Sequence, residues 1–397
     1  MTAVATARLS TTARRTLLAL SAGNFIVGIA AFVVLGLMTT ITRDLSIDPA
    51  EGARLMTFYA VAYAMGSPLL IAGTGKLPRR LVVTSAMLLV AVGSLACALS
   101  PTLVGMEAAR VLTAFGAGLF SPAASAIAVS LVSPERRGWV LSQVFMGFTA
   151  AQGIGNPIGA WLGYAFGWRW AFGAIGVLAL VTTAVVWRSV PAATEFRPTS
   201  LAELLRILRT PHMLVALLFT VCFVGATYTT LTFLTLILEQ RLGLGGAGVA
   251  IVLAIYGCMA FAAAVLSGPV TDRFGPSTVL LTLCALLVML MPLVTQGPAQ
   301  IVALTVIVGG WSLCSWFHFT AQQSRLVAIA PALAQLLLAL NASMLYVGIS
   351  IGSLLAARLL PIPEFKGLAI GAVVQLALAA SILIVGDRMI ARQRVGS

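Results

Sequence analysis

The sequence predicts an all-α integral membrane protein with twelve transmembrane helices in two six-helix, pseudo-symmetric halves. Three observations support this fold class. The composition is 60% hydrophobic and only 9% charged over 397 residues, with a mean hydropathy of +1.05, which leaves too little polar surface for a water-soluble globule. Long apolar runs recur along the whole chain. The second half of the sequence also repeats the pattern of the first.

The apolar runs have the length that a membrane span requires. A helix needs about 20 mostly apolar residues to cross roughly 30 Å of hydrocarbon. Twelve runs meet this requirement, and we expect each to form one spanning helix. In chain order they cover residues 17–41, 53–72, 81–99, 102–131, 139–162, 170–187, 213–238, 248–270, 276–294, 300–323, 332–357 and 366–386.

One connecting segment is much longer than the others. Residues 188–212 separate an N-terminal six-helix half, residues 1–187, from a C-terminal six-helix half, residues 213–397. Within the segment, Ser200 and Glu203 have the spacing of a capping box, and four leucines share one helical face. We therefore expect a cytoplasmic linker that carries a short amphipathic helix on the membrane surface.

The two halves are related by a constant offset. A shift of 197 residues places Tyr59 on Tyr256 and Gly155 on Gly352 without a gap. Repeated units of this size are a signature of secondary transporters, whose substrate sites lie near the bilayer midplane where the repeats meet. The repeat therefore predicts a substrate path between the halves.

Small residues recur at every fourth position in the fifth predicted helix and in its counterpart, the eleventh. Such a stripe lets a neighbouring backbone approach closely. Static packing inside a bundle is one interpretation, whereas its occurrence in both halves favours an interface that moves. The positions are Gly147, Ala151, Gly155, Gly159 and Gly163, then Gly348, Gly352 and Ala356.

The distribution of basic residues predicts the orientation. Lys and Arg resist translocation, and with a cytoplasmic N-terminus seventeen of them lie in cytoplasmic segments and six on the other side. We expect a multi-pass protein of a bacterial inner membrane with both termini in the cytoplasm. The net charge of +13 is spread over separate loops without an aromatic platform, so we expect no binding to nucleic acid.

Catalytic and metal-binding patterns are missing from the sequence. The five cysteines all lie in apolar runs and lack the spacing of metal ligands, so we interpret them as buried, unreactive thiols. No HExxH or P-loop motif occurs, and there is no GxSxG nucleophile elbow, because the GxSxG match at Gly348–Gly352 lies inside an apolar run. We therefore expect neither an enzyme nor a cofactor or metal site. Without a nucleotide site, transport would be driven by a gradient.

Three short segments carry a family resemblance. "GPVTDRFG" at Gly268–Gly275 matches the loop motif GxxxDRxG, "RVLTAFGAG" at Arg110–Gly118 looks like a helix-four motif, and "GIGNPIGAWLG" at Gly153–Gly163 looks like a helix-five motif. With them the chain resembles the major facilitator superfamily over essentially its whole length, and within it the twelve-helix drug–proton antiporters and sugar-efflux permeases. The resemblance implies the major facilitator fold and proton-coupled efflux of small amphipathic molecules by alternating access. We expect a monomer whose partners are a small-molecule substrate, protons and the lipid bilayer.

The loop motif is complete only in the second half. The resemblance implies that Asp272 and Arg273 act as a conformational latch between helix ends, whereas Gly75 stands at the equivalent position of the first half. A solvated charge in a tight turn is the alternative interpretation of Asp272. In helix four, Thr113 and Ala114 stand where many exporters have Gln-Gly. For close helix packing the helix-five motif offers Gly155, Pro157 and Gly159.

The resemblance also implies which helices line the pathway, namely the first, fourth, seventh and tenth. Glu107 and Arg110 lie three residues apart and share a face. An arginine inside the bilayer needs a partner, and Glu107 is the nearest acid and the one carboxylate inside a predicted span. It is therefore either the proton carrier or an interfacial acid that neutralises Arg110. The candidates for the substrate and proton pathway are Asn24, Glu107, Arg110, Tyr228, Trp316 and His318.

Two further interpretations concern His318 and the substrate. His318 is the one histidine deep in a predicted span, where it either carries protons or packs through a hydrogen bond. Helix one offers Asn24 but no carboxylate, which favours a neutral or weakly charged substrate over an organic cation. Import of a small metabolite is the nearer alternative to export. A non-transporting sensor or scaffold is the other, although the longest loop of about 25 residues leaves no room for a soluble signalling domain.

Overall fold

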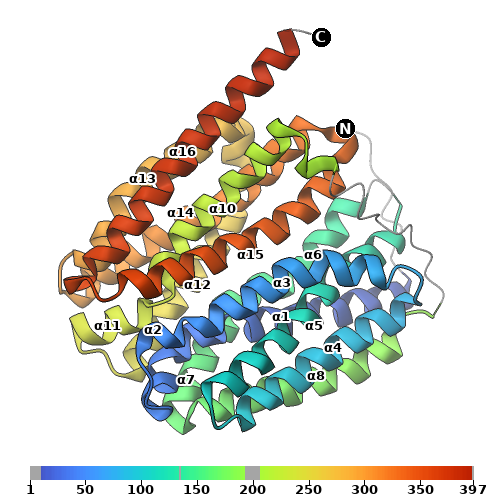
Figure 1. The fold of residues 1–397 in the computed structure, drawn as a ribbon. Helices are drawn as coiled ribbons and strands as arrows, with labels where there is room; N and C mark the ends of the chain where they lie inside the picture. The colour runs from blue at the N-terminus through green and yellow to red at the C-terminus, as the bar shows by residue number, and fades with distance from the viewer. Residues whose placement is uncertain (1–9, 134–135, 193–205, 396–397) are drawn as a thin grey trace.

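The computed structural model describes residues 10–133, 136–192 and 206–395. These residues form a bundle of long helices without a strand in the described ranges. The first described helix begins, and the last one ends, on the same side of the bundle (Figure 1). The all-α fold class predicted from the sequence is confirmed.

The first half of the chain contains helices that begin at recognisable caps. Ser10 accepts a hydrogen bond from the Ala13 amide at the start of α1, and Asp48 and Glu51 form a capping box at the start of α2. The elements are α1 (Thr11–Asp44), α2 (Pro49–Gly52), α3 (Arg54–Gly73), α4 (Arg79–Leu99), α5 (Leu103–Ser130), α6 (Arg137–Ala150), the π-helix Ala151–Gly155, α7 (Asn156–Phe166) and α8 (Trp168–Ser189).

The second half has the same order of long helices. Gly243 ends α11 in the left-handed conformation, and Gly275, with φ of 80°, makes the turn between α12 and α13. The elements are α10 (Pro211–Leu231), α11 (Leu234–Leu242), α12 (Gly246–Phe274), α13 (Pro276–Gln296), α14 (Ile301–Ile329), α15 (Ala334–Leu359) and α16 (Lys366–Val395), with one-turn 3-10 helices at Pro331–Leu333 and Pro363–Phe365.

The described residues make twelve crossings of the bundle. Eleven are helices long and apolar enough to span a membrane. The twelfth is the continuous run α6, π-helix and α7, which corresponds to the predicted fifth span. Its interruption has a local cause, because Pro157 has no amide proton and the Asn156 amide donates five residues back to the Ala151 carbonyl.

The helices of the two halves pack in the same pairs. In the first half α1 contacts α6, α7 and α8, and in the second half α10 contacts α15 and α16. The pair α3 and α5 corresponds to α12 and α14, and the contacts of α4 with α5 and α8 correspond to those of α13 with α14 and α16. The bounds of α13 are those of α4 moved on by 197 residues. The two groups occupy separate parts of the bundle (Figure 1).

The outer surface of the bundle is apolar, as contact with lipid requires. On α8, for example, Leu178, Val181 and Val185 lie on one helical face and are about half exposed. Exposed apolar rows of this kind recur on α3, α13 and α16. They mark the faces that a bilayer would cover.

The small-residue stripes lie inside each half and not between the halves. A Cβ atom added to Gly155 would lie 2.3 Å from a side-chain carbon of Ile29 in α1, and one added to Gly352 would lie 2.4 Å from the Gly225 carbonyl oxygen in α10. These contacts fit the static-packing interpretation, because the stripe uses the helix face that packs on α1 or α10. That the stripes form a moving interface stays a prediction. Gly153, outside the stripe, faces Gly257 of α12.

The predicted linker falls largely outside the structure. Helix α8 continues to Ser189 and α10 begins at Pro211. Ser200 and Glu203, which define the predicted amphipathic helix, lie outside the described residues.

Candidate functional site

The two halves meet mainly along three groups of helix contacts. Helix α3 packs on α15, α12 packs on α7 and the preceding π-helix, and α1 contacts α11. We call the side of the bundle that contains Asp44 and Leu242 the loop side. The opposite side, where α1 begins at Thr11 and α16 ends at Val395, is the terminus side.

Aromatic side chains from both halves meet in the middle of these contacts. The rings of Tyr63 in α3 and Tyr346 in α15 are stacked, with centroids 3.6 Å apart and planes at 22°. Tyr59 lies 6.2 Å from Tyr346, and Phe32 of α1 lies 6.1 Å from Tyr228 of α10. All five side chains are buried. The predicted pathway residue Tyr228 is thus part of the contact between the halves.

Arg110 of α5 lies beside this aromatic group and is completely buried. Its guanidinium donates to the carbonyl oxygens of Ala30 and Ala31 in α1, the latter at 2.8 Å, and lies 4.1 Å from the centre of the Tyr59 ring. Carbonyl dipoles and the ring face therefore compensate its charge, in place of a carboxylate.

Glu107 pairs with a different arginine. Its Oε1 forms an ion pair with Nε of Arg54 in α3 at 2.8 Å, and its Oε2 accepts a hydrogen bond from Nη2 at 3.1 Å. Glu107 is buried, whereas Arg54 is 45% exposed at the loop side. The interpretation that Glu107 neutralises Arg110 is wrong. Helical side chains tilt toward the helix N-terminus, and α5 begins at the loop side, so Glu107 reaches outward to Arg54.

A second carboxylate, that of Glu239 in α11, joins the halves. Its Oε1 accepts hydrogen bonds from Thr39 of α1 at 2.8 Å and Tyr164 of α7 at 2.5 Å. Its Oε2 forms an ion pair with Arg43 of α1 at 2.6 Å. The Glu239 side chain is 8% exposed and that of Arg43 70%. Three side chains of the first half thus hold one acid of the second half at the loop side.

Sequence reasoning missed Glu239 because it placed the end of the seventh span at residue 238. The helix turns at Thr232 and Phe233 and continues through α11 to Leu242, so the acid lies within a spanning helix. The statement that Glu107 is the one carboxylate inside a span is therefore wrong. The available signal was the apolar run "LTLILEQRL", which contains a single acid before its glycine stop.

Asn24 and His318 each have partners within their own half. Asn24 of α1 donates to the Val144 carbonyl at 3.3 Å and accepts a bond from Ser121 at 2.7 Å. His318 of α14 pairs through Nδ1 with the Ser315 carbonyl, and its ring is stacked on that of Phe223 with centroids 4.5 Å apart. Both arrangements fit packing roles.

The remaining candidates lie outside the aromatic group between the halves. Trp316 of α14 is half-buried against the core. Asp272 and Arg273 are exposed at the terminus-side end of α12, where Arg273 lies 5.3 Å from the Phe274 ring centre. Among the described residues no ion-pair partner faces Asp272. The latch role of Asp272 and Arg273 stays a prediction. Pro157 is buried in the first turn of α7.

Comparisons with known proteins agree with this geometry. The family model described as Major Facilitator Superfamily matches residues 20–391. The chain is 29% identical over 333 residues to the MFS-type transporter YbcL of Bacillus subtilis, covering 83% of this chain and 85% of that protein. It is 27% identical over 340 residues to a chloramphenicol resistance protein of Streptomyces lividans, covering 84% and 86%. Among solved structures, a bacterial homologue of the human lysosomal transporter Spinster, in an inward-facing and unoccupied conformation, superposes with a TM-score of 0.78 at 16% identity, covering 96% of this chain and 98% of that one.

Proposed function

The chain belongs to the major facilitator superfamily, a family of membrane transporters and not a class of enzymes, and on this basis we propose that it exports small amphipathic molecules in exchange for protons. The substrate class is a drug-like compound or a sugar. The protein acts as a monomer in the bacterial inner membrane with both termini in the cytoplasm, and it works by alternating access.

The contact of Glu239 with Thr39, Arg43 and Tyr164 is the observation that carries this proposal. It joins the halves at the loop side through two hydrogen bonds and one ion pair, all of which are reversible. Opening this contact while the terminus side closes would expose the aromatic group between the halves to the opposite side of the membrane. Such rocking of one repeat against the other is the general basis of alternating access.

The chemistry around the aromatic group supports an uncharged or weakly charged substrate. The buried charge nearest to it is the cation Arg110, which is held by carbonyl oxygens. A second cation there would meet repulsion in a medium of low dielectric. Aromatic rings offer stacking partners for planar molecules, and a relative is named for resistance to chloramphenicol. Both points favour export of a drug-like compound.

Proton coupling requires an acid whose protonation changes the relation of the halves. Glu107 is paired within the first half, and it remains one candidate. Glu239 is the stronger one, because adding a proton to its carboxyl removes the ion pair with Arg43 and weakens the closed loop side. We propose that Glu239 links proton binding to opening.

A tolerance and accumulation assay tests the direction of transport. The protein is expressed in a bacterial strain that lacks its main efflux pumps, and a chemical panel that includes chloramphenicol is applied. Export predicts increased tolerance to some compounds and lower intracellular accumulation of them, both abolished by a protonophore. Increased sensitivity with faster accumulation would indicate import and overturn the proposal.

A further inference from the structure

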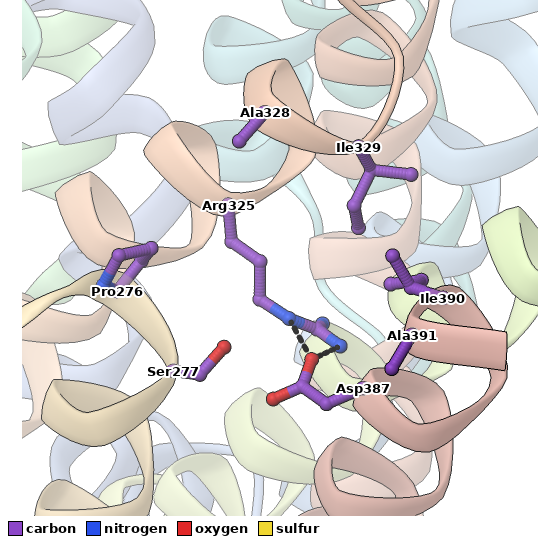
Figure 2. Close-up of a pocket in the computed structure, with 8 residues that line it drawn as sticks. All are labelled: Pro276, Ser277, Arg325, Ala328, Ile329, Asp387, Ile390 and Ala391. Carbon is purple, nitrogen blue, oxygen red and sulfur yellow. Dashed lines mark hydrogen bonds and ion pairs between the residues drawn. The ribbon is translucent and has the colours of Figure 1, made fainter. Parts of the chain in front are cut away.

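A cavity of about 480 Å³ lies at the terminus side of the second half, away from the contact between the halves. Three helix ends enclose it, namely the first turn of α13, the last turns of α14 and the final part of α16 (Figure 2). Its polar members are Ser277, Arg325 and Asp387, and the rest of its wall is apolar. Nothing in the proposed transport cycle uses this place.

Arg325 lies in the wall of the cavity and has one hydrogen-bond donor unsatisfied. Its side chain is only 3% exposed, and its Nε and Nη2 donate to Oδ1 of Asp387 at 3.1 and 2.8 Å (Figure 2). Nη1 is buried without a hydrogen-bond partner among the described residues. A buried charged donor without an acceptor is costly, so an acceptor bound in the cavity would stabilise it.

The amino end of α13 adds further donors. Its N-cap, Gly275, makes no side-chain cap, and Pro276 has no amide proton. The amides of Ser277 and Thr278 therefore have no acceptor within the helix. Helix amino ends of this kind favour phosphate oxygens, as does a guanidinium. Together with Nη1 of Arg325 they make one wall of the cavity suited to a phosphate group.

A groove continues from the polar mouth along the outer surface of α13 and α16, lined by apolar side chains together with Thr278 and Thr282. A second cavity of about 440 Å³ shares Ser277 and Asp387 with the first and runs between α13 and α16 past Leu281 and Leu383. Both helices are apolar spans, and Leu281 is 39% exposed on their outer surface. The combined shape has a polar end at the membrane boundary and an apolar end toward the hydrocarbon, which is the shape of a lipid and not of a free anion.

We propose that this pair of cavities binds one glycerophospholipid with a phosphoethanolamine headgroup. The phosphate lies against Arg325 and the first turn of α13, the ammonium faces the free Oδ2 of Asp387, and one acyl chain lies between α13 and α16. The charge of the headgroup decides between lipid classes. Arg325 and Asp387 together are neutral and match a zwitterion, whereas an anionic headgroup would place an uncompensated negative charge beside Asp387.

Native mass spectrometry of the delipidated full-length protein tests this assignment. The protein is titrated with phosphatidylethanolamine, phosphatidylglycerol and inorganic phosphate, and the variants are Arg325→Gln, Leu281→Trp and, as a matched control, Arg358→Gln. Arg358 is an exposed arginine at the loop-side end of α15. We expect phosphatidylethanolamine affinity to fall about tenfold or more in the first two variants and to stay unchanged in the control.

The two variants change different parts of the proposed lipid site, so a loss of binding in both cannot come from one shared defect. Arg325→Gln removes the phosphate donor, whereas Leu281→Trp fills the groove and leaves the polar residues in place. Monomeric elution and an unchanged thermal unfolding midpoint identify folded variants, and Asp387→Asn should in addition remove the preference for phosphatidylethanolamine over phosphatidylglycerol. Equal phosphatidylethanolamine affinity in wild type and both variants would overturn the proposal. Tighter binding of phosphatidylglycerol, or phosphate binding without lipid binding, would do the same.

Discussion

At the scale of single residues, the compensation of Arg110 by carbonyl oxygens has a measurable consequence. A lysine at this position cannot reach Ala30 and Ala31 with two donors in one plane. Since a hydrogen bond to a charged group contributes about 1.5–3 kcal/mol, we expect Arg110→Lys to lower the free energy of unfolding by about 2 kcal/mol or more. Thermal and denaturant unfolding in detergent measures this change in the free energy of unfolding.

The matched control for Arg110 is Glu107→Gln. Its partner Arg54 is half exposed, and pairs of this kind contribute about 0–1 kcal/mol, so the loss of stability should be small. Were Glu107→Gln as destabilising as Arg110→Lys, the assignment of Arg54 as the partner of Glu107 would fail.

The ring of Tyr59 contributes to the stability of the protein, whereas its hydroxyl does not. The ring lies under the Arg110 guanidinium, whereas the hydroxyl is buried without a hydrogen-bond partner among the described residues. Tyr59→Phe is therefore expected to leave stability unchanged or to increase it slightly, and Tyr59→Leu to lower it by about 1–2 kcal/mol. Unfolding measurements on both variants separate the two contributions, and equal losses would contradict the cation–π assignment.

Glu107 and Arg110 also show what could not be predicted from the sequence. The spacing of Glu107 and Arg110 correctly indicates a shared helical face, but it does not tell how far each side chain reaches along the helix. Arg110 finds its acceptors on α1, about 80 positions earlier in the chain. Every residue has a backbone carbonyl oxygen, so residue identity does not indicate which carbonyls accept hydrogen bonds from Arg110. These partners could therefore not be recognised from the sequence.

At the scale of elements, the glycines of the fifth crossing divide between two neighbours. A Cβ on Gly155 would meet Ile29 of α1, and a Cβ on Gly257 would lie 2.4 Å from the Gly153 Cα atom across the contact between the halves. Gly155→Ala should destabilise the fold by about 1–3 kcal/mol, because the halves cannot separate to relieve it. Gly257→Ala should leave stability nearly unchanged and shift the halves apart.

Gly310→Ala provides the control for both glycine variants. It lies in the interior of α14, and no atom lies within 4 Å of an added Cβ. Unfolding midpoints and a distance measurement between spin labels on the two halves distinguish the outcomes. A loss of stability in Gly257→Ala as large as in Gly155→Ala would show that the contact between the halves is as rigid as the packing within one.

The number and order of the spanning helices follow from the sequence, whereas their irregularities do not. Apolar run length determines a span, and the predicted starts of the ninth and twelfth spans, at Pro276 and Lys366, coincide with those of α13 and α16. The π-helix before Asn156 depends on Pro157 together with packing on two neighbours. The turn at Phe233, which brings Glu239 into a spanning helix, also lacks a proline or glycine in the sequence.

At the scale of the whole molecule, removal of the charge on Glu239 should open the loop side. Spin labels on cysteines introduced at Asp48 and Glu364 report the distance between the halves there, in a background with Cys258 replaced because this thiol is exposed. We expect Glu239→Gln to shift the distance distribution to longer values, because the ion pair with Arg43 is lost.

Glu107→Gln is the control for this experiment, since its ion pair lies within the first half. It should leave the distance between the labels unchanged. Identical distributions in wild type and Glu239→Gln would show that Glu239 does not hold the loop side closed, and the coupling role would then pass to Glu107.

The close backbone packing inside each half gives the molecule an uneven stiffness. Close glycine packing holds each group of six crossings together, and we call each group a block. The contact between the blocks, which we call the seam, combines stacked rings, one carboxylate and the approach of Gly257 to Gly153. We therefore expect the easiest large motion of the molecule to be a tilt of one block against the other. We expect a substitution within a block to change the stability of the protein, and a substitution in the seam to change its transport rate. Under selection for a new substrate, we therefore expect substitutions to accumulate first among the residues of the seam.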